Sequence, residues 1–109
     1  MRLRFRKVCN SKTFASWVRS LSKSSGVYLI RALDGEMLYI GESHTKRLYK
    51  TLTRHFQKWS DYRRYRIVYD RNSVRVAVVQ TPDEIAFEKQ NVLIARFKPR
   101  DNIIINDQT

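Results

Sequence analysis

The chain has 109 residues, 42% hydrophobic and 29% charged, which predicts one folded domain with one modest core and excludes an intrinsically disordered chain. Lysine and arginine total 22 against 10 acidic residues, which gives a formal net charge of +12, and no acidic residue precedes Asp34. Such a surplus attracts polyanions, so nucleic acid is the expected partner, with a merely solvated basic surface as the alternative.

The single cysteine, Cys9, excludes an intrachain disulfide and fits a reducing compartment. No apolar run approaches the roughly 18 residues that would span a membrane, and the basic N-terminus lacks the apolar stretch of a signal peptide. We therefore expect an intracellular protein, in the cytoplasm or nucleoid, without a membrane partner.

Residues 1–25 are predicted to form a basic N-terminal strand and helix. Basic and apolar residues alternate over residues 2–6, as in a short strand with one cationic, solvated face. Ser11 or Thr13 can then cap a helix. Its apolar residues have the spacing of one buried helical face: Phe14, Trp17, Val18 and Leu21.

The strongest hairpin signal in the chain is Asp34-Gly35, which joins two β-prone runs, residues 26–33 and 36–41. A basic helix is predicted next, over residues 45–59.

A second hairpin is predicted after this helix. It would pair residues 65–69 with residues 74–81 across a turn at residues 70–72.

The last helix has a clear start signal, with Thr81 as its cap, Pro82 in the first turn and Glu84 closing a capping box. It should run to about Phe97 and stop before Pro99.

These elements follow one another in the order β-α-ββ-α-ββ-α. We expect an α+β fold in which helices flank a small central, mostly antiparallel sheet. Residues 1–109 then form a single domain, with a C-terminal tail over residues 103–109.

The first hairpin should place two tyrosines on one face of the sheet. Pairing that is symmetric about the turn puts Tyr39 opposite Ile30 and Gly41 opposite Tyr28, and all four share a face. The alternative is that both tyrosines simply pack in the core. The other face would carry Leu29, Leu38 and Ile40.

Two triplets in this hairpin, Gly26-Val27-Tyr28 and Tyr39-Ile40-Gly41, resemble the signature of the GIY-YIG endonucleases in type, order and spacing. Valine replaces isoleucine in the first triplet. Residues 98–102, Lys-Pro-Arg-Asp-Asn, resemble the terminal Lys-Pro-x-x-Asn of that family. The resemblance covers residues 26–102 and implies a metal-dependent endonuclease that hydrolyses phosphodiester bonds of DNA.

The resemblance implies that Tyr28 helps to activate water, or acts as a base, and that Tyr39 is a neighbouring hydrogen-bonding phenol. Gly26, Gly41 and Asn102 would support the site. A free phenol has a pKa near ~10, so a phenol that acts as base at neutral pH needs cationic neighbours or a metal-linked relay.

The basic helix places His55 on the same stripe as Leu48 and Leu52, facing the core. The family resemblance implies an arginine here that holds the scissile phosphate, with a histidine or tyrosine one turn later. His55 fits the second role, but Thr51 stands one turn before it. The positive charge that holds the phosphate must then come from Arg54, which is preferred, or from Arg47. Alternatively, the two arginines are merely solvated, and His55 is a buried imidazole whose hydrogen bonds are satisfied. The flank beside His55 carries Arg47, Thr51, Arg54 and Lys58.

Gln90 falls on an apolar stripe of the last helix, with Ala86, Leu93 and Phe97. The family carries a glutamate at this position that binds a divalent ion, Mg²⁺ or Mn²⁺. An amide keeps the shape but loses the charge, so metal binding and cleavage are expected to be weak or absent. A natural non-catalytic protein, a deliberate substitution that traps uncleaved substrate, and a structural amide are the open explanations.

The first functional hypothesis is therefore a DNA endonuclease impaired at position 90, directed by DNA structure, such as a branch, or by the backbone. A naturally non-catalytic module that binds DNA, or less favourably RNA, is the alternative. A third is a basic protein of an RNA–protein particle, with Trp59, Tyr62 and Tyr65 stacking on unpaired bases. A homodimer stays open. The candidate backbone contacts are Arg2, Arg4, Arg6, Lys12, Lys46, Lys50, Lys58, Arg63 and Arg64.

Overall fold

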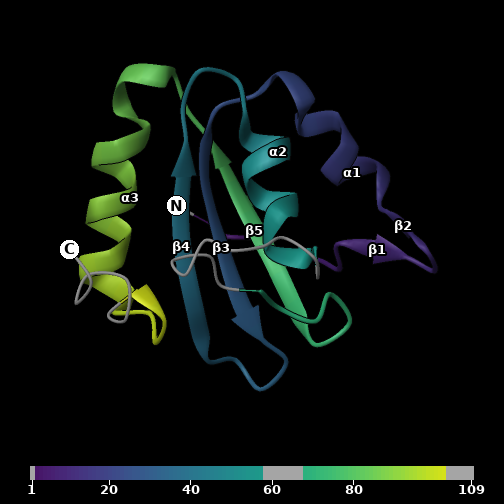
Figure 1. Ribbon diagram of the computed structural model, residues 1–109. Helices are drawn as coiled ribbons and strands as arrows, with labels where there is room; N and C mark the ends of the chain where they lie inside the picture. Colours follow the sequence, from purple (N-terminus) through teal and green to yellow (C-terminus); the bar gives the residue numbers. More distant parts are fainter. Residues whose placement is uncertain (1, 58–67, 103–109) are drawn as a thin grey trace.

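The computed structural model describes residues 2–57 and 68–102. Its centre is a three-stranded antiparallel sheet in the order β4-β3-β5, built from β3 (Gly26–Ala32), β4 (Met37–Ser43) and β5 (Val74–Gln80). Helices flank this sheet, and helix α3 (Asp83–Phe97) lies alongside β4 (Figure 1). The α+β architecture is as predicted. The other elements are β1 (Cys9–Asn10), β2 (Thr13–Phe14), α1 (Ser16–Arg19), α2 (Leu48–Thr53), α3 (Asp83–Phe97) and the 3₁₀ helices η1 (Ser20–Lys23) and η2 (Arg54–Phe56).

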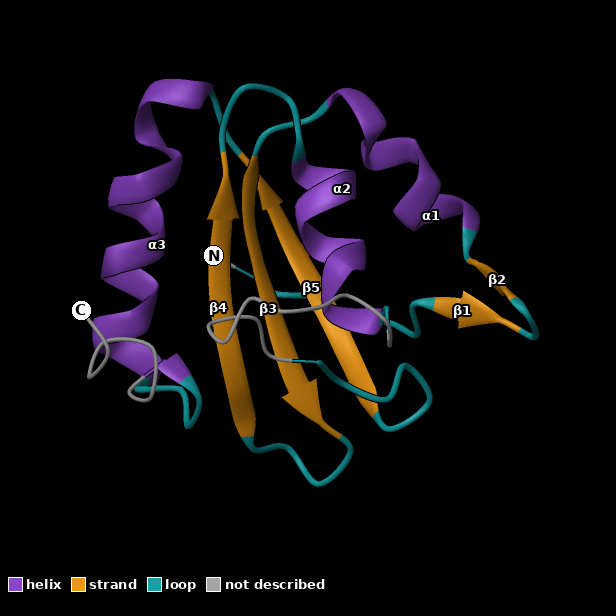
Figure 2. Cartoon of the chain, in the orientation of Figure 1, coloured by secondary structure: helices purple, strands orange, loops and turns teal. Residues whose placement is uncertain are grey.

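Apolar side chains cover both faces of the sheet. Figure 2 shows the helices α2 and α3 beside its strands. On one face, Tyr28 and Ile30 of β3 pack with Leu52 of α2. On the opposite face, Leu29 packs with Leu93 of α3. All five residues are at most 2% exposed, so β3 lies at the centre of the core.

The predicted register of the first hairpin is confirmed. Tyr28 pairs with Gly41 and Ile30 pairs with Tyr39. Nearer the turn the register shifts, because Arg31 pairs with Met37 and a bulge lies between. The prediction for Leu38 is therefore wrong, since the bulge turns this side chain toward the face of the phenols, where it joins their core cluster.

The N-terminal segment differs from the predicted strand and helix. Residues 2–6 form no strand, and only Arg6 makes a bridge, to Val76 on the outer edge of β5. The predicted caps Ser11 and Thr13 belong instead to a small hairpin, in which Ser11 has a φ of 59° and Thr13 lies in β2. The helix therefore begins later, at Ser16.

The basic helix is also shorter than predicted, and α2 begins at Leu48. Thr45 and Lys46 have φ angles of 63° and 59°, which a helix cannot contain. After Thr53 the chain tightens into the 3₁₀ helix η2, which carries His55.

The last helix begins at Asp83 and ends at Phe97, before Pro99 as predicted. The predicted capping box is wrong, because Pro82 is the N-cap residue of α3 and no side chain makes a capping hydrogen bond there. The hydroxyl of Thr81 donates to the Pro82 carbonyl instead. None of the helices in the described ranges is long and apolar enough to cross a bilayer.

The second predicted hairpin would pair residues 65–69 with β5, but the structure shows β5 paired with another strand. Strand β5 pairs with β3, while Val68 and Tyr69 lie outside any strand. Residues 65–67 lie outside the described residues. The predicted turn is present, because the Ser73 amide donates to the Asp70 carbonyl at 2.9 Å.

Candidate active site

Four aromatic side chains from separate elements meet on the α2 side of the sheet. The ring centroids of Tyr28 and Tyr39 lie 6.1 Å apart, and both rings contact His55, at 5.4 and 4.9 Å between centroids. Tyr69, from the segment before β5, lies 6.0 Å from the imidazole centroid. The structure thus brings three candidate residues together and adds a third phenol that the sequence did not reveal.

A buried hydrogen bond joins the Tyr28 hydroxyl to Nε2 of His55 over 2.8 Å. Burial raises the pKa of Tyr28 well above its ordinary value, and the neighbouring Tyr39 and Glu42 raise it further. Each of these causes raises the pKa, so the expectation that cationic neighbours lower it is wrong. Tyr28 is protonated at neutral pH and can donate to a neutral imidazole.

The two signature glycines are required by close contacts. A Cβ on Gly41 would lie closer than 3.0 Å to the Tyr28 hydroxyl, so the phenol occupies the space that the glycine leaves. Gly26 has a φ of +154°, and a Cβ there would collide with the Val79 carbonyl. One glycine thus shapes the phenol pair and the other allows β3 to approach β5.

Asn102 fixes the end of the described chain to the strand that carries Tyr39. Its Oδ1 accepts from the Ile40 amide and its Nδ2 donates to the Ile40 carbonyl, both at 2.8 Å. The residue is buried, with 6% exposure. Its support of the site is therefore structural, through β4.

Tyr69 is held in the cluster by two hydrogen bonds. Its hydroxyl donates to Oδ2 of Asp101 at 2.6 Å, and its amide donates to the His55 carbonyl at 2.7 Å. Arg100 donates to both oxygens of the same carboxylate, at 2.8 and 3.0 Å. Burial acts to raise the pKa of Asp101, but the hydrogen bonds from Arg100 and Tyr69 outweigh it, so this pKa is lowered. The only sequence signal for this arrangement was an acid next to Asn102 in a strongly basic chain.

Replacing Tyr69 with phenylalanine is expected to lower the free energy of unfolding by about 1–2 kcal/mol at pH 7, because a buried carboxylate loses a hydrogen bond. The folded-state pKa of Asp101 is depressed, so its stabilising effect is present above the unfolded pKa of about 3.9 and is lost as the pH falls through the folded pKa. In urea unfolding, the difference between Tyr69→Phe and the parent should stay constant above about pH 5 and shrink as the pH falls below about 4.

Tyr49→Phe is the matched control for this change. Tyr49 is a partly buried tyrosine on the same core cluster, with its ring 6.3 Å from that of Phe14. Equal losses of stability in the two variants would contradict the prediction, as would a Tyr69→Phe difference that stays constant into acid.

The two candidate arginines lie together. Arg47 and Arg54 line one hollow of about 280 Å³ beside the end of β4, as does Thr51. Glu42 lies in the same hollow, and His44 contacts its carboxylate at 3.1 Å. A phosphate bound in this hollow would lie beside two arginine residues.

Gln90 is half-buried on α3, on the same side as the buried residues Ala86 and Leu93. This side packs on the sheet face opposite to the phenols, while α3 also contacts β4, the strand of Tyr39. The Gln90 amide donates to Oδ1 of Asn91 over 3.4 Å. The contacts of the described residues therefore do not join Gln90 to the phenols.

The residues at this position do not fit a tightly held divalent ion. Mg²⁺ prefers carboxylate oxygens, and Gln90 offers a neutral amide. Within residues 2–57 and 68–102, no group of three or more histidine, cysteine or acidic side chains could hold a metal ion.

Six of the candidate backbone contacts are exposed on the surface, where a polyanion can reach them. These are Arg2, Arg4, Arg6, Lys12, Lys46 and Lys50. The other candidates, Lys58, Arg63 and Arg64, lie outside the described residues, as do Trp59, Tyr62 and Tyr65.

Comparison with known proteins identifies the family. A family model described as the UvrC-like GIY-YIG domain matches residues 24–103. The UvrABC system protein C of Methylococcus capsulatus is 35% identical over 97 residues, and those of Hydrogenovibrio crunogenus and Prochlorococcus marinus are 31% identical over 93 and 28% over 107. These alignments cover 88%, 84% and 97% of this chain but only 15%, 15% and 16% of the relatives. The chain belongs to the family of UvrC-like GIY-YIG domains.

Proposed function

We propose that this chain binds DNA through its phosphodiester backbone or its structure, for example at a branch. We further propose that it is a GIY-YIG nuclease whose metal-dependent hydrolysis is impaired by Gln90. The observation that carries the proposal is the buried hydrogen bond between Tyr28 and His55, with Tyr39 in contact with both rings. The family match supports it, because residues 24–103 include all three residues and both signature triplets.

The Tyr28–His55 pair offers a route for the proton that hydrolysis releases. When water attacks the phosphorus, its oxygen forms a new bond to phosphorus, the ester bond to the leaving oxygen breaks, and the water must lose a proton. Because the pKa of Tyr28 is raised, a free phenolate is not available as the base. The Tyr28 oxygen can instead accept the water proton while its own proton passes to Nε2 of His55, so the charge ends on the imidazole.

The hollow lined by Arg47 and Arg54 is the proposed binding site of the scissile phosphate. Both arginines line it, and Arg54 directly precedes His55 in the chain. Charge that develops on the phosphate oxygens would be stabilised there. The exposed cations elsewhere on the surface would hold neighbouring phosphates without reading the base sequence.

A naturally non-catalytic nucleic-acid-binding module is the second candidate. It is favoured by one observation, the neutral amide of Gln90 at the position of the family's metal-binding glutamate. It would keep the fold and the cationic surface, and RNA could then replace DNA as the partner.

Restoring the acid tests the proposal. The parent and Gln90→Glu are incubated with branched, linear and supercoiled DNA and Mg²⁺, and binding is measured alongside. The parent should bind these DNAs and cut them slowly or not at all, while Gln90→Glu should cut at least about tenfold faster. A carboxylate at this position would hold a divalent ion better than the amide does, and such an ion would supply charge that stabilises a leaving oxygen.

Asn91→Asp is the control, because it adds the same charge to the neighbouring exposed residue. A folded Gln90→Glu variant that binds DNA but cuts none of it would overturn the nuclease proposal and leave the non-catalytic module. Equal activation by Asn91→Asp would show that position 90 is not the metal ligand.

A further inference from the structure

The loop between β4 and α2 holds two residues in a backbone conformation that amino acids with a Cβ avoid. Thr45 and Lys46 are consecutive, and their φ angles are 63° and 59°. A left-handed pair without glycine persists only where surrounding contacts hold it in place.

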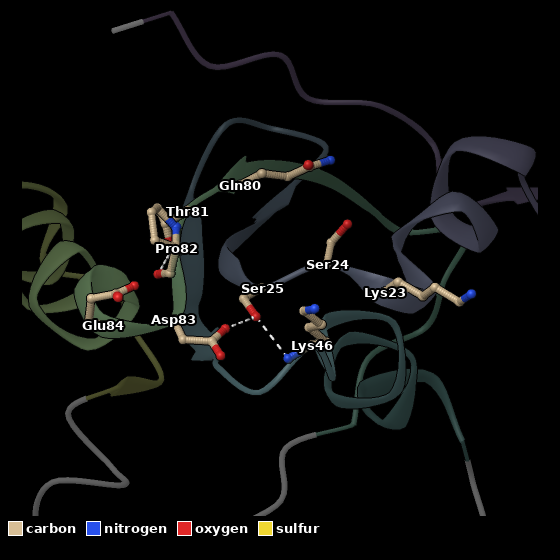
Figure 3. A pocket seen from close by; sticks show the side chains of 9 residues that line it. All are labelled: Lys23, Ser24, Ser25, Lys46, Gln80, Thr81, Pro82, Asp83 and Glu84. Carbon is tan, nitrogen blue, oxygen red and sulfur yellow. Dashed lines mark hydrogen bonds between the residues drawn. The ribbon is translucent and has the colours of Figure 1, made fainter.

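Ser25, just before β3, and Asp83, the first residue of α3, supply such contacts (Figure 3). The Lys46 amide donates to Oγ of Ser25 at 2.8 Å, and this hydroxyl donates in turn to Oδ1 of Asp83. Hydrogen bonds from Ser25 and from the Thr45 backbone lower the pKa of Asp83, so the carboxylate is ionised at neutral pH. Ser25 is 6% exposed and cannot easily turn to water instead.

The same loop carries one of the two arginines of the candidate phosphate seat. Arg47 follows the left-handed pair directly and is the cap residue of α2. It lines the hollow of about 280 Å³ together with Arg54, which comes from the 3₁₀ helix η2. A change of backbone conformation at Thr45 and Lys46 would therefore move Arg47 relative to Arg54.

We propose that Ser25 and Asp83 form a latch that holds Thr45 and Lys46 in this conformation and so places Arg47 beside Arg54 to grip one DNA phosphate. This inference rests on the proposed DNA-binding function. Ser25 and Asp83 are positioning residues, since they act on DNA only through the loop.

The latch is tested first by amide hydrogen exchange, which needs no DNA. Ser25→Ala should speed exchange of the Lys46 amide at least about tenfold, because this amide loses its acceptor. Ser24→Ala is the matched control, because Ser24 contributes its backbone carbonyl, not its hydroxyl, to the Leu48 amide. Asp83→Asn should act in the same direction as Ser25→Ala and serves if that variant does not fold.

The link to Arg47 is tested by a double-mutant cycle on the Kd for duplex DNA at low salt. Ser25→Ala and Arg47→Ala should each weaken binding about threefold to tenfold. The double variant should bind no more weakly than Arg47→Ala alone, because the latch acts through Arg47. Adding Thr45→Gly to Ser25→Ala should recover affinity at least about twofold, because glycine accepts the left-handed conformation.

Additive effects in the cycle would overturn the latch, as would unchanged exchange at Lys46 or equal effects of Ser24→Ala. Exposure of the Lys46 amide with no change in DNA affinity would also overturn it, while the nuclease proposal would still stand or fall on Gln90→Glu. A parent chain that binds no DNA at all would instead overturn the proposed function.

Discussion

Replacing Gly41 with alanine is expected to lower the free energy of unfolding by about 1–3 kcal/mol, because the added methyl overfills a packed core. The new Cβ would lie closer than 3.0 Å to the Tyr28 hydroxyl and 2.9 Å from Cε2 of Tyr39. Tyr28 is 2% exposed and bonded to His55, so its ring cannot move aside without breaking that hydrogen bond. Urea unfolding measures the loss of stability, and the NMR resonances of the His55 ring report the loss of the bond.

Gly35→Ala is the matched control. Gly35 also has a positive φ, 101°, but a Cβ there would meet nothing within 4 Å. Its replacement should cost about 1–2 kcal/mol of backbone strain and leave the His55 resonances in place. His55 resonances that stay unchanged in Gly41→Ala would mean that the phenol is not seated beside this glycine.

In the Gln90→Glu background, replacing Tyr28 with phenylalanine is expected to reduce kcat for DNA cleavage by about 10²–10⁴-fold. The ring and its packing remain, but the oxygen that receives the water proton and passes its own proton to His55 is lost. The Kd for DNA should change less than about twofold, because the hydroxyl is bonded to His55 and is not proposed to bind phosphate. Single-turnover cleavage and a binding titration separate the two effects.

His55→Gln provides the second half of this experiment. If Tyr28 and His55 act as one relay, the double variant should be no slower than the slower single variant. Tyr49→Phe removes a hydroxyl elsewhere on the core cluster and should leave kcat unchanged. A Tyr28→Phe enzyme that keeps more than about half of the parent rate would exclude the proton route.

The part of the site that sequence could predict is the part fixed by local rules. The Asp34-Gly35 turn and the alternation of side chains place Tyr28 and Tyr39 on one face. The helical spacing from Leu48 and Leu52 predicts that His55 faces them, and it does so although it lies in the 3₁₀ helix η2, after α2 has ended. The bulge that redirects Leu38 interrupts this alternation, and no residue type in the strand predicted a bulge there.

Several other features that the sequence did not reveal come from contacts between distant segments. The starts of α2 and α3 both depend on Ser25, which bonds to Lys46 and Asp83, 21 and 58 residues away. Tyr69 enters the aromatic cluster through Asp101, 32 residues away. A propensity scale cannot register such pairs, because each partner looks like an ordinary surface residue on its own.

The side-chain amide of Asn102 makes the two hydrogen bonds with Ile40 that the backbone of an adjoining strand would make. Strand β4 is an outer strand of the sheet, and outer strands are templates onto which another extended chain can add. At Ile40 the outward N–H and C=O are already taken by Asn102. Two copies of the chain could not pair their sheets through β4 at this point unless the segment that holds Asn102 moved away. A dimer that presents two sites to the two strands of a duplex would therefore need a different contact surface.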